Sequence, residues 1–306
     1  MKIIITGASG LVGRALTHEL RKRGHQTFAL RHEDNNRNHE KDLTWSIKFN
    51  YVNLKGFEDA DVLIHLAGAN IAKPWTKKHK EDIFLSRVRG TELLVDEILA
   101  QNIRIKHFIS TSAIGYYEDP GVHLAENSPP GTGFLSEVCM GWEKPLERLK
   151  NTHIQSSVIR TGLVLSNEAG VFPTLNMTLK LGVVPSTGSK SNIWSWIHLS
   201  DLVNIYADLA EEKITPGIYN GVAPHFTTQG EMINEILKNA PFPRKRLNPF
   251  TFSPNVPAWF LKLVMGERSQ IALSSQGVCS ISLLQNGFSF QFKRIEDAVK
   301  DLLSKH

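Results

Sequence analysis

Met1-Lys-Ile-Ile-Ile-Thr6 runs directly into Gly7-Ala-Ser-Gly10-Leu-Val-Gly13, and this stretch decides the fold. The first six residues form a short, β-branched apolar run, which is typical of a buried strand. A helical pattern follows from Leu11 to Arg23, and Gly24 is expected to end it. A second strand is predicted over Thr27–Leu30. The order strand, glycine turn, helix, strand predicts a βαβ unit at the start of the chain.

The three glycines of this turn have the spacing G-x-x-G-x-x-G. Gly7 would allow the tight turn, Gly10 would let the backbone approach a pyrophosphate, and Gly13 would let the helix pack closely on the sheet. The free N–H groups at the helix start, from Leu11 and Val12, would then face the phosphates. We therefore expect a dinucleotide site; the alternative is a tight turn with a purely structural role.

The end of the second strand bears on the choice of dinucleotide. An NAD site usually offers a carboxylate there, which binds the ribose hydroxyls. Here Leu30 and Arg31 end the strand, and a guanidinium pairs well with the 2′-phosphate of NADP. Glu33 and Asp34 follow closely and keep NAD open, and Arg31 could also be an exposed loop residue. The strand end favours NADP.

The rest of the chain divides into two parts. Further strands are predicted over 61–66, 106–110 and 154–160, with helices over 76–101 and 134–149 between them. After residue 165 the pattern loosens into helical segments near 201–211, 229–237, 256–265 and 294–303. The expected fold is α/β, a Rossmann-type doubly wound parallel sheet with a smaller C-terminal substrate lobe. Residues 1–165 would form the NADP-binding domain, and 166–306 a mixed α/β region that is mainly the substrate lobe.

The amino-acid composition and net charge indicate which kinds of partner the protein is expected to lack. The chain has 306 residues, 41% of them apolar and 21% charged, which suits a globular protein. Its net charge of +5 comes without a nucleic-acid motif, so we expect no nucleic acid partner. Two distant cysteines argue against disulfides and a metal site. No apolar run is long enough for a bilayer and the first residues look like a core strand, so we expect a cytoplasmic protein with no membrane partner. The oligomeric state stays open.

Several further segments together carry a resemblance to a known family. They are Leu66-Ala-Gly68, Pro74-Trp-Thr76, Ser86-Arg87, Ser112-Ala-Ile-Gly-Tyr-Tyr117, Trp142-Glu143, Arg160-Thr-Gly-Leu-Val-Leu165, Trp196-Ile-His-Leu-Ser-Asp201 and Asn220-Gly-Val-Ala-Pro224. With the glycine turn they span nearly the whole chain. In this order they resemble the epimerase-like branch of the extended, atypical short-chain dehydrogenases/reductases.

The resemblance implies a set of cofactor contacts beyond the glycine turn. Leu66, Ala67 and Gly68 would line the cofactor with their backbone. Asp82 and Arg87 would lie near it on the long helix. The loop after Arg160, which contains Leu163, would close over the nicotinamide end. Two other residues of the matching segments, His198 and Asp201, would serve structure, with Asp201 capping the helix that follows.

The catalytic residues depart from the family pattern. Relatives use a serine to hold the substrate oxygen, and a tyrosine with a lysine four residues later to move the proton. Ser112 matches the serine and is expected just past the end of its strand. The tyrosine and lysine positions align with Phe134 and Val138, and neither side chain can transfer a proton.

The missing tyrosine has three possible replacements. Tyr116 and Tyr117 follow Ser112 closely and are the plausible phenols, although either could simply pack its ring in a pocket wall. Tyr51 and Lys55 have the right spacing, but they precede the 61–66 strand, so chance explains them better.

The resemblance implies an NADP(H)-dependent oxidoreductase or redox epimerase that acts on a small carbonyl or alcohol. The alternative is a non-catalytic NADP(H)-binding redox sensor or regulatory protein, which the missing dyad favours. The family often has basic residues near the C-terminus, where this chain has Ser275-Gln-Gly-Val-Cys-Ser-Ile281. This difference puts a shared anionic substrate in doubt.

Overall fold

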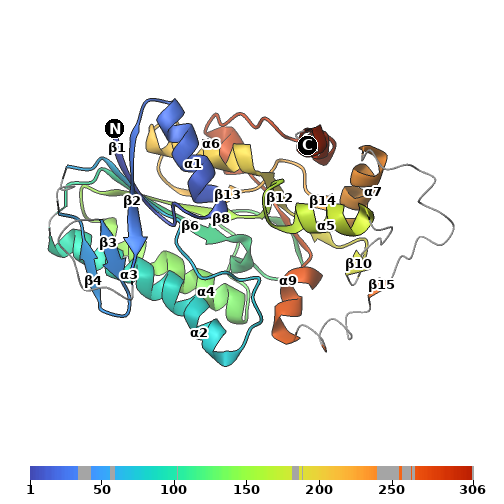
Figure 1. Cartoon of the computed structure of the whole chain (residues 1–306), viewed down its shortest axis with the longest axis horizontal. Coiled ribbons are helices and arrows are strands. Elements are labelled where there is room, and N and C mark those ends of the chain that lie inside the picture. The colour runs from blue at the N-terminus through green and yellow to red at the C-terminus, as the bar shows by residue number, and fades with distance from the viewer. Residues whose placement is uncertain are drawn as a thin grey trace.

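A mainly parallel sheet is the centre of the computed structural model, which describes residues 1–33, 43–55, 59–101, 103–180, 186–187, 189–239, 255–256, 263 and 266–304. The strand order is β13-β8-β6-β5-β1-β2-β3-β4, and Figure 1 shows the sheet with its flanking helices. The strands are β1 Lys2–Thr6, β2 Gln26–His32, β3 Thr44–Ser46, β4 Tyr51–Asn53, β5 Val62–His65, β6 His107–Ala113, β8 Gln155–Thr161 and β13 Ile218–Gly221. Within this sheet the edge strand β4 is antiparallel to β3 and the other neighbours are parallel. The predicted α/β, Rossmann-type fold is confirmed.

The N-terminal βαβ unit forms where the sequence predicts it. Helix α1 runs over Leu11–Lys22, and Gly24, with φ of 86°, follows its end. Strand β2 is longer than predicted and includes Arg31 and His32. The extension arises because β2 also pairs with β3, at Arg31 opposite Thr44.

The helical stretch predicted over 76–101 is confirmed, and it contains a π turn. The run divides into α2 Lys77–Phe84, a π-helical turn η1 Leu85–Arg89 and α3 Gly90–Ala100. Thr76 caps α2, because its hydroxyl accepts a hydrogen bond from the N–H of His79 (3.1 Å). The π turn carries Arg87, and such turns are frequent at functional sites.

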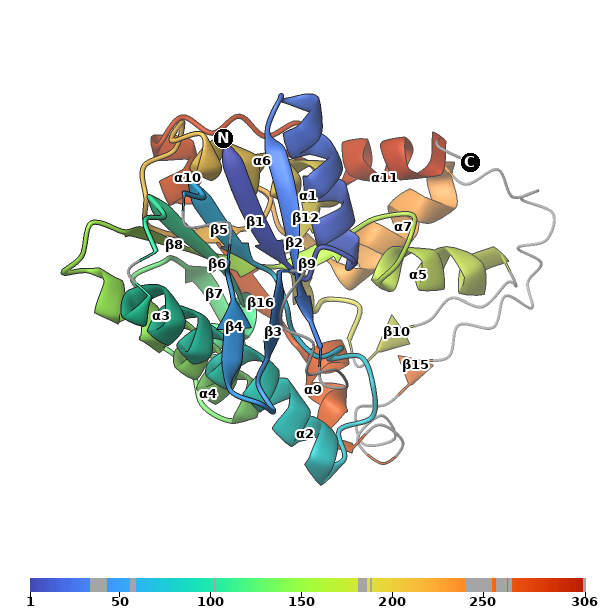
Figure 2. The ribbon, with the colours of Figure 1, turned by 60° about the vertical axis from the view of Figure 1, so that its left-hand side comes forward.

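Helices cover both faces of the sheet, as Figure 2 shows. On one face Ile3 and Ile5 pack against α1 and against α6, which spans Leu199–Ala210. On the other face Ile4 and Leu63 pack against α3 and the 3-10 helix η3, Lys144–Leu149, which continues from α4, Phe134–Glu143. The alternation along β1 buries both sides of the strand, as expected for a parallel sheet.

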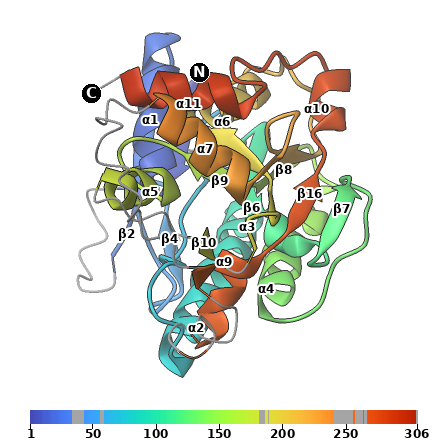
Figure 3. The ribbon, with the colours of Figure 1, turned by 90° about the vertical axis from the view of Figure 1, so that its right-hand side faces the viewer.

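The C-terminal part adds its own core but also completes the sheet. Helices α5 Val171–Lys180, α7 Gln229–Asn239 and α11 Ile295–Ser304 share an apolar cluster (Figure 3). Yet β13 pairs with β8, and α6 packs against α1, both within the N-terminal layers. The division at residue 165 therefore stays a prediction. The helix expected near 256–265 falls mostly outside the described residues.

Shorter elements complete the described chain. They are η2 Ile114–Tyr116, β7 Gly121–Leu124, β9 Leu163–Leu165, β10 Ser186–Thr187, β11 Ile193–Trp194, β12 Trp196–His198, β14 Thr227–Thr228, β15 Asn255–Val256, η5 Gly266–Arg268, α9 Ser269–Leu273, β16 Gln276–Val278 and α10 Ile281–Gln285. None of the described helices has the length and apolar character needed to cross a bilayer.

The predicted capping role of Asp201 is wrong. The cap of α6 is His198, whose Nδ1 accepts a hydrogen bond from the N–H of Ser200 (3.1 Å). Asp201 is fully buried and accepts the N–H groups of Gln291 (2.8 Å) and Phe292 (2.9 Å). Its carboxylate therefore holds the C-terminal segment against α6, a long-range contact that the local sequence does not reveal.

Candidate functional site at the carboxyl edge of the sheet

The strand order reverses its direction between β1 and β5, and this point defines the site. From β1 the chain continues to β2 on one side, while β5, β6, β8 and β13 follow on the other. The loops after β1, β5, β6 and β8 therefore meet at one edge of the sheet. In open α/β sheets, ligands bind at this edge next to the reversal. The strands point toward the end of the molecule that carries α2 and α9 (Figure 2).

Glycine is needed to a different degree at each of the three positions of the turn. Gly7 has φ of +68°, and a Cβ there would lie 2.8 Å from the carbonyl carbon of Leu66. A Cβ at Gly13 would lie 2.2 Å from the carbonyl oxygen of Gly7, so Gly13 is required for the helix to pack on the turn. Gly10 has an ordinary φ of −72°, and a Cβ there would meet only the Gly7 oxygen, at 3.2 Å. Within the protein, a Cβ at Gly10 would therefore make one close contact, far less than a Cβ at Gly7 or Gly13.

The start of α1 supplies hydrogen-bond donors beside Gly10. Gly10 is the N-cap residue, and no side chain caps the helix. The first N–H groups of a helix, here those of Leu11 and Val12, have no partner within the helix. They and the positive end of the helix dipole suit an anion.

A buried pair, Thr6 and His65, fixes the loop after β5. The Thr6 hydroxyl accepts the N–H groups of Leu66 (3.1 Å) and Ala67 (3.2 Å). Its single proton is therefore donated to Nδ1 of His65, 2.7 Å away. Burial, and secondarily the charge of Arg87, lowers the pKa of His65 to about 3, so the ring is neutral at pH 7. Sequence reasoning missed this pair, although each residue directly precedes a segment it singled out.

Arg87 lies against the same loop. A Cβ on Gly68 would be 3.0 Å from its guanidinium carbon. Its Nη1 donates to the carbonyl oxygens of Ala69 (3.1 Å) and Ile83 (3.4 Å), and the cation lies 4.9 Å from the ring centroid of Trp142. Within the described part of the chain Arg87 forms no ion pair with a carboxylate. Burial lowers the pKa of this guanidinium.

The other predicted cofactor residues are spread around this edge. Leu30 is buried in the core, and Arg31 next to it is exposed at the end of β2. Leu163 opens β9, where its N–H donates to the carbonyl of Ser195 (2.8 Å). Asp82 is exposed on α2, with its carboxylate 3.7 Å from His79. Asp34, the alternative ribose ligand, lies outside the described residues.

Ser112 belongs to β6 itself, which runs to Ala113, so its expected place past the strand end is wrong. Its hydroxyl donates to Oε1 of Glu143 (2.7 Å). Arg160 binds both oxygens of this carboxylate, through Nε (2.9 Å) and Nη2 (2.7 Å). Ser112 and Arg160 are both 2% exposed. The Ser112 proton is therefore held by a buried ion pair.

The two neighbouring tyrosines differ in what their hydroxyls do. Tyr117 is buried; its hydroxyl donates to Oδ1 of Asn220 (2.6 Å) and accepts from Nη1 of Arg160 (2.9 Å). Burial raises the pKa of Tyr117 to about 12. Tyr116 is half-buried with its ring 3.5 Å above the Arg160 guanidinium, and its hydroxyl has no hydrogen bond to any described residue.

Phe134 and Val138 have the surroundings of apolar residues. Phe134 begins α4, where its ring meets that of Trp75 edge to face at 5.2 Å, and Nζ of Lys80 lies 4.6 Å from its centroid. Val138 is 3% exposed. The other Tyr-x-x-x-Lys pair begins on β4, at the far edge of the sheet from Ser112.

Gln276 occupies the stretch where the resemblance led us to look for basic residues. Its side chain is buried, and Nε2 donates to the carbonyl oxygens of Tyr117 (3.0 Å) and Glu118 (3.1 Å). The C-terminal segment thus holds the loop that carries both tyrosines. Nothing in the local sequence indicates this long-range contact.

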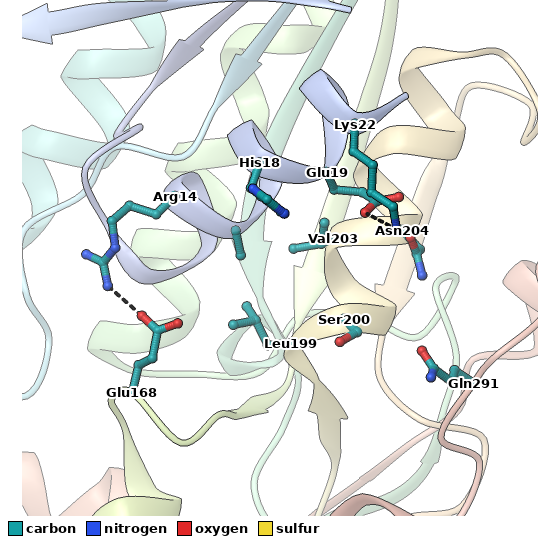
Figure 4. A pocket seen from close by; sticks show the side chains of 11 residues that line it. Arg14, His18, Glu19, Lys22, Glu168, Leu199, Ser200, Val203, Asn204 and Gln291 are labelled. Atoms are coloured by element: carbon teal, nitrogen blue, oxygen red, sulfur yellow. Dashed lines mark hydrogen bonds and ion pairs between the residues drawn. The ribbon is translucent and has the colours of Figure 1, made fainter. Parts of the chain in front are cut away.

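A separate groove lies between α1 and α6 (Figure 4). Its volume is about 520 Å³, and its lining includes Arg14, His18, Ser200 and Gln291. Arg14 is paired there with Glu168 at 2.9 Å. Its charged groups largely neutralise one another, and none of the predicted site residues lines it.

Fold and edge geometry together define an extended short-chain dehydrogenase/reductase of the epimerase-like type. The NAD dependent epimerase/dehydratase family model matches residues 3–220, and the chain belongs to this family. A second model, a domain of unknown function (DUF1731), matches residues 256–302.

Relatives match over the full length. An epimerase family protein of Staphylococcus aureus is 28% identical, with 99% of each chain covered. The chloroplastic SDR39U1 homolog of Arabidopsis thaliana is 29% identical over 99% of this chain and 87% of its own. Among solved structures, the human epimerase family protein SDR39U1 (isoform 2) with NADPH has a TM-score of 0.83 at 24% identity, with both chains fully covered.

Proposed function

We propose that the chain is an NADP(H)-dependent oxidoreductase, or a redox epimerase, that acts on a small carbonyl or alcohol compound. The observation that carries the proposal is Arg87, a partly buried cation against the loop after β5 with no carboxylate partner among the described residues. Burying a charge without a counter-ion is costly. A phosphate of the dinucleotide would supply that counter-ion.

The residues at the edge fit the cofactor. The backbone at Gly10 and the N–H groups of Leu11 and Val12 suit a pyrophosphate. The backbone of Leu66–Gly68, fixed by Thr6, would border the rest of the dinucleotide. Once bound, the nicotinamide ring would supply the hydride donor or acceptor.

The choice of NADP over NAD rests on Arg31. It is exposed at the end of β2, where a guanidinium would meet a 2′-phosphate. Solved relatives bind either form: the human protein is described with NADPH, and a UDP-glucuronic acid 4-epimerase from Bacillus cereus with NAD.

Calorimetric titration tests this choice. NADPH should bind more tightly than NADH by about tenfold or more, since a charge-assisted hydrogen bond contributes roughly 1.5–3 kcal/mol. Arg31→Ala should remove the preference, whereas Arg148→Ala, at an exposed arginine paired with Asp96, should keep it. Equal affinities of the wild type for NADPH and NADH, or a preference for NADPH that survives Arg31→Ala, would contradict the assignment of Arg31 to the 2′-phosphate.

The three catalytic candidates are Ser112, Tyr116 and Tyr117. Of these, Tyr116 has a hydroxyl that makes no hydrogen bond to any described residue. The Ser112 proton is donated to Glu143 and that of Tyr117 to Asn220. Because both protons are already donated within the protein, these hydrogen bonds support the alternative function, a non-catalytic NADP(H)-binding redox sensor. Cofactor binding without turnover of any carbonyl or alcohol would favour the sensor.

A further inference from the structure

The hydroxyl of Tyr116 is a free phenol at the carboxyl edge. It forms no hydrogen bond with the described part of the chain, and it is accessible to solvent. The neighbouring hydroxyls of Ser112 and Tyr117 donate their protons within the protein. Hydride transfer to a carbonyl carbon leaves negative charge on the oxygen, which needs a proton donor within hydrogen-bond reach. Of the three catalytic candidates, Tyr116 therefore has the proton that can be given away without breaking a contact.

The rest of Tyr116 is held in place. Its carbonyl oxygen accepts a hydrogen bond from the N–H of Gly131 (2.8 Å). The hydroxyl of Ser136 lies within hydrogen-bond distance of the carbonyl oxygens of Tyr116 (3.0 Å) and Gly131 (2.8 Å), which joins this loop to the first turn of α4. The ring meets that of buried Tyr117 edge to face, with 5.3 Å between the centroids. The free hydroxyl is thus carried by a residue whose backbone and ring have fixed neighbours.

One face of the Tyr116 ring lies on the guanidinium of Arg160, whose central carbon is 3.5 Å from the ring centroid. Arg160 is bound to both oxygens of Glu143, through Nε (2.9 Å) and Nη2 (2.7 Å). Two such parallel bonds fix the orientation of a guanidinium, and its planar group stacks on aromatic faces. Because Glu143 neutralises the charge of Arg160, the contribution of Arg160 to Tyr116 is a flat surface in a fixed orientation.

This stacked pair lies where the cofactor site and the substrate side meet. Arg160 is opposite Ser112 on the neighbouring strands β8 and β6, close to where both strands end. The loop that follows Arg160, which contains Leu163, is the one expected to close over the nicotinamide end. Tyr116 is therefore next to the strand end from which that loop begins.

We propose that Tyr116 exchanges the proton with the substrate oxygen, and that Arg160, held by Glu143, is the residue that positions it; this inference rests on the proposed function. In the reductive direction the carbonyl carbon gains a hydride from the reduced cofactor, which is thereby oxidised. The electron pair of the broken C=O π bond moves to the oxygen. The O–H bond of Tyr116 breaks, and its proton goes to that oxygen. The phenolate left on Tyr116 regains a proton from water, which reaches this hydroxyl.

Tyr116→Phe tests the proton transfer, with NADPH oxidation followed in the presence of butanal, cyclohexanone or 4-nitrobenzaldehyde. The variant should lower kcat about a hundredfold or more, which is the usual contribution of a general acid. Its NADPH affinity and its urea midpoint should not change, because the lost hydroxyl has no hydrogen bond to a described residue. Tyr51→Phe, on β4 at the far edge of the sheet, is the matched control and should retain wild-type turnover.

The possible failures of this test differ. Wild-type kcat in folded Tyr116→Phe would overturn this inference and leave the proposed function intact. A wild type that binds NADPH but reduces none of the three carbonyls would favour the sensor, and would overturn the proposed oxidoreductase and this inference with it.

Arg160→Lys tests the positioning role, because lysine retains the charge that pairs with Glu143 and lacks the flat group. We expect kcat to fall about tenfold or more, since small misplacements of a reacting group are costly, while KM and NADPH affinity stay level. The slowing of kcat by D₂O should increase, because proton transfer becomes the slower step. Arg148→Lys, at an exposed pair with Asp96, should change none of these values.

Glu143→Gln is the second variant in case Arg160→Lys does not fold. It removes the charge that holds the guanidinium and should change kcat and the solvent isotope effect in the same direction. A folded variant of either kind with wild-type kcat, or with a lower kcat and an unchanged solvent isotope effect, would overturn the positioning role.

Discussion

The polar groups on the two halves of the carboxyl edge differ in whether they have partners within the protein. On the cofactor side, the uncapped start of α1 and the Arg87 cation have no carboxylate or side-chain oxygen to bind among the described residues. On the other side, Ser112, Tyr117 and Arg160 are each hydrogen bonded within the protein.

This difference separates groups that await a ligand from groups that hold the fold. Unsatisfied donors at a partly buried site carry a free-energy cost that a bound anion removes. Satisfied groups have no such need, and using them in catalysis would first require breaking their contacts. The contrast predicts that substitutions on the two sides affect different measurements.

The largest effect is expected from Glu143→Ala. It would leave Arg160, which is 2% exposed, without its carboxylate. The hydrogen bonds and charge of Glu143 outweigh burial and hold the pKa of Arg160 above its usual value, so the cation would stay charged. Loss of one partner from a buried pair costs about 3–5 kcal/mol of unfolding free energy.

Urea unfolding measures this cost, and NADPH affinity of the folded variant should be unchanged. Glu168→Ala is the matched control, because it breaks the exposed pair with Arg14, and such pairs contribute about 0–1 kcal/mol. Similar losses in the two variants would remove the distinction between the halves.

On the cofactor side, Arg87→Met should have the opposite profile. NADPH affinity should fall about tenfold or more, since a charge-assisted contact is lost. The unfolding free energy should stay level or rise, because an apolar side chain replaces a partly buried cation without a counter-ion. Arg89→Met, on the exposed side of the same π turn and paired with Glu92, should change neither quantity much. A destabilised Arg87→Met that binds NADPH normally would assign Arg87 to structure.

Local patterns were enough to predict the framework. The apolar run of Ile3–Ile5, the glycine turn and the helix after Leu11 appear as expected because each depends on neighbours in sequence. The helical stretch over 76–101 also appears, although its periodicity does not reveal the π turn that carries Arg87. The β3–β4 pair was missed because its strands are three residues each and lie in a polar stretch.

The candidate site divides in the same way. Gly7, Gly10 and Gly13 could be found from spacing, whereas the Ser112–Glu143 and Glu143–Arg160 contacts join residues 31 and 17 positions apart. Residue type alone suggested that Ser112 and Tyr117 could be catalytic. Only tertiary structure reveals where their protons go.

A smaller loss of stability should follow from lowering the pH. The pKa of buried His65 is lowered to about 3 from a usual value of 6.5, chiefly by burial. Between these values the unfolded chain binds a proton that the folded chain does not, so stability falls as pH decreases below about 6.5. His65 alone should contribute a slope of about 1.4 kcal/mol per pH unit.

Unfolding curves between pH 7.5 and 4.5 check this, with His65→Gln as the comparison. In the variant, the slope of unfolding free energy against pH should be smaller by about the His65 contribution. The part of the slope that comes from other titrating groups should remain. An unchanged slope would mean that His65 does not stay neutral in the folded protein, and the Thr6 hydrogen-bond assignment would fail with it.

Titration of Gly10→Val with NADPH, beside the wild type, tests the central claim most directly. The backbone at Gly10 accepts any residue, and a Cβ there meets only the Gly7 oxygen at 3.2 Å, so circular dichroism should report a folded protein. The account predicts that the wild type binds NADPH and that the folded variant does not, because the valine fills the space meant for the pyrophosphate. NADPH binding of wild-type strength by the folded variant would contradict it.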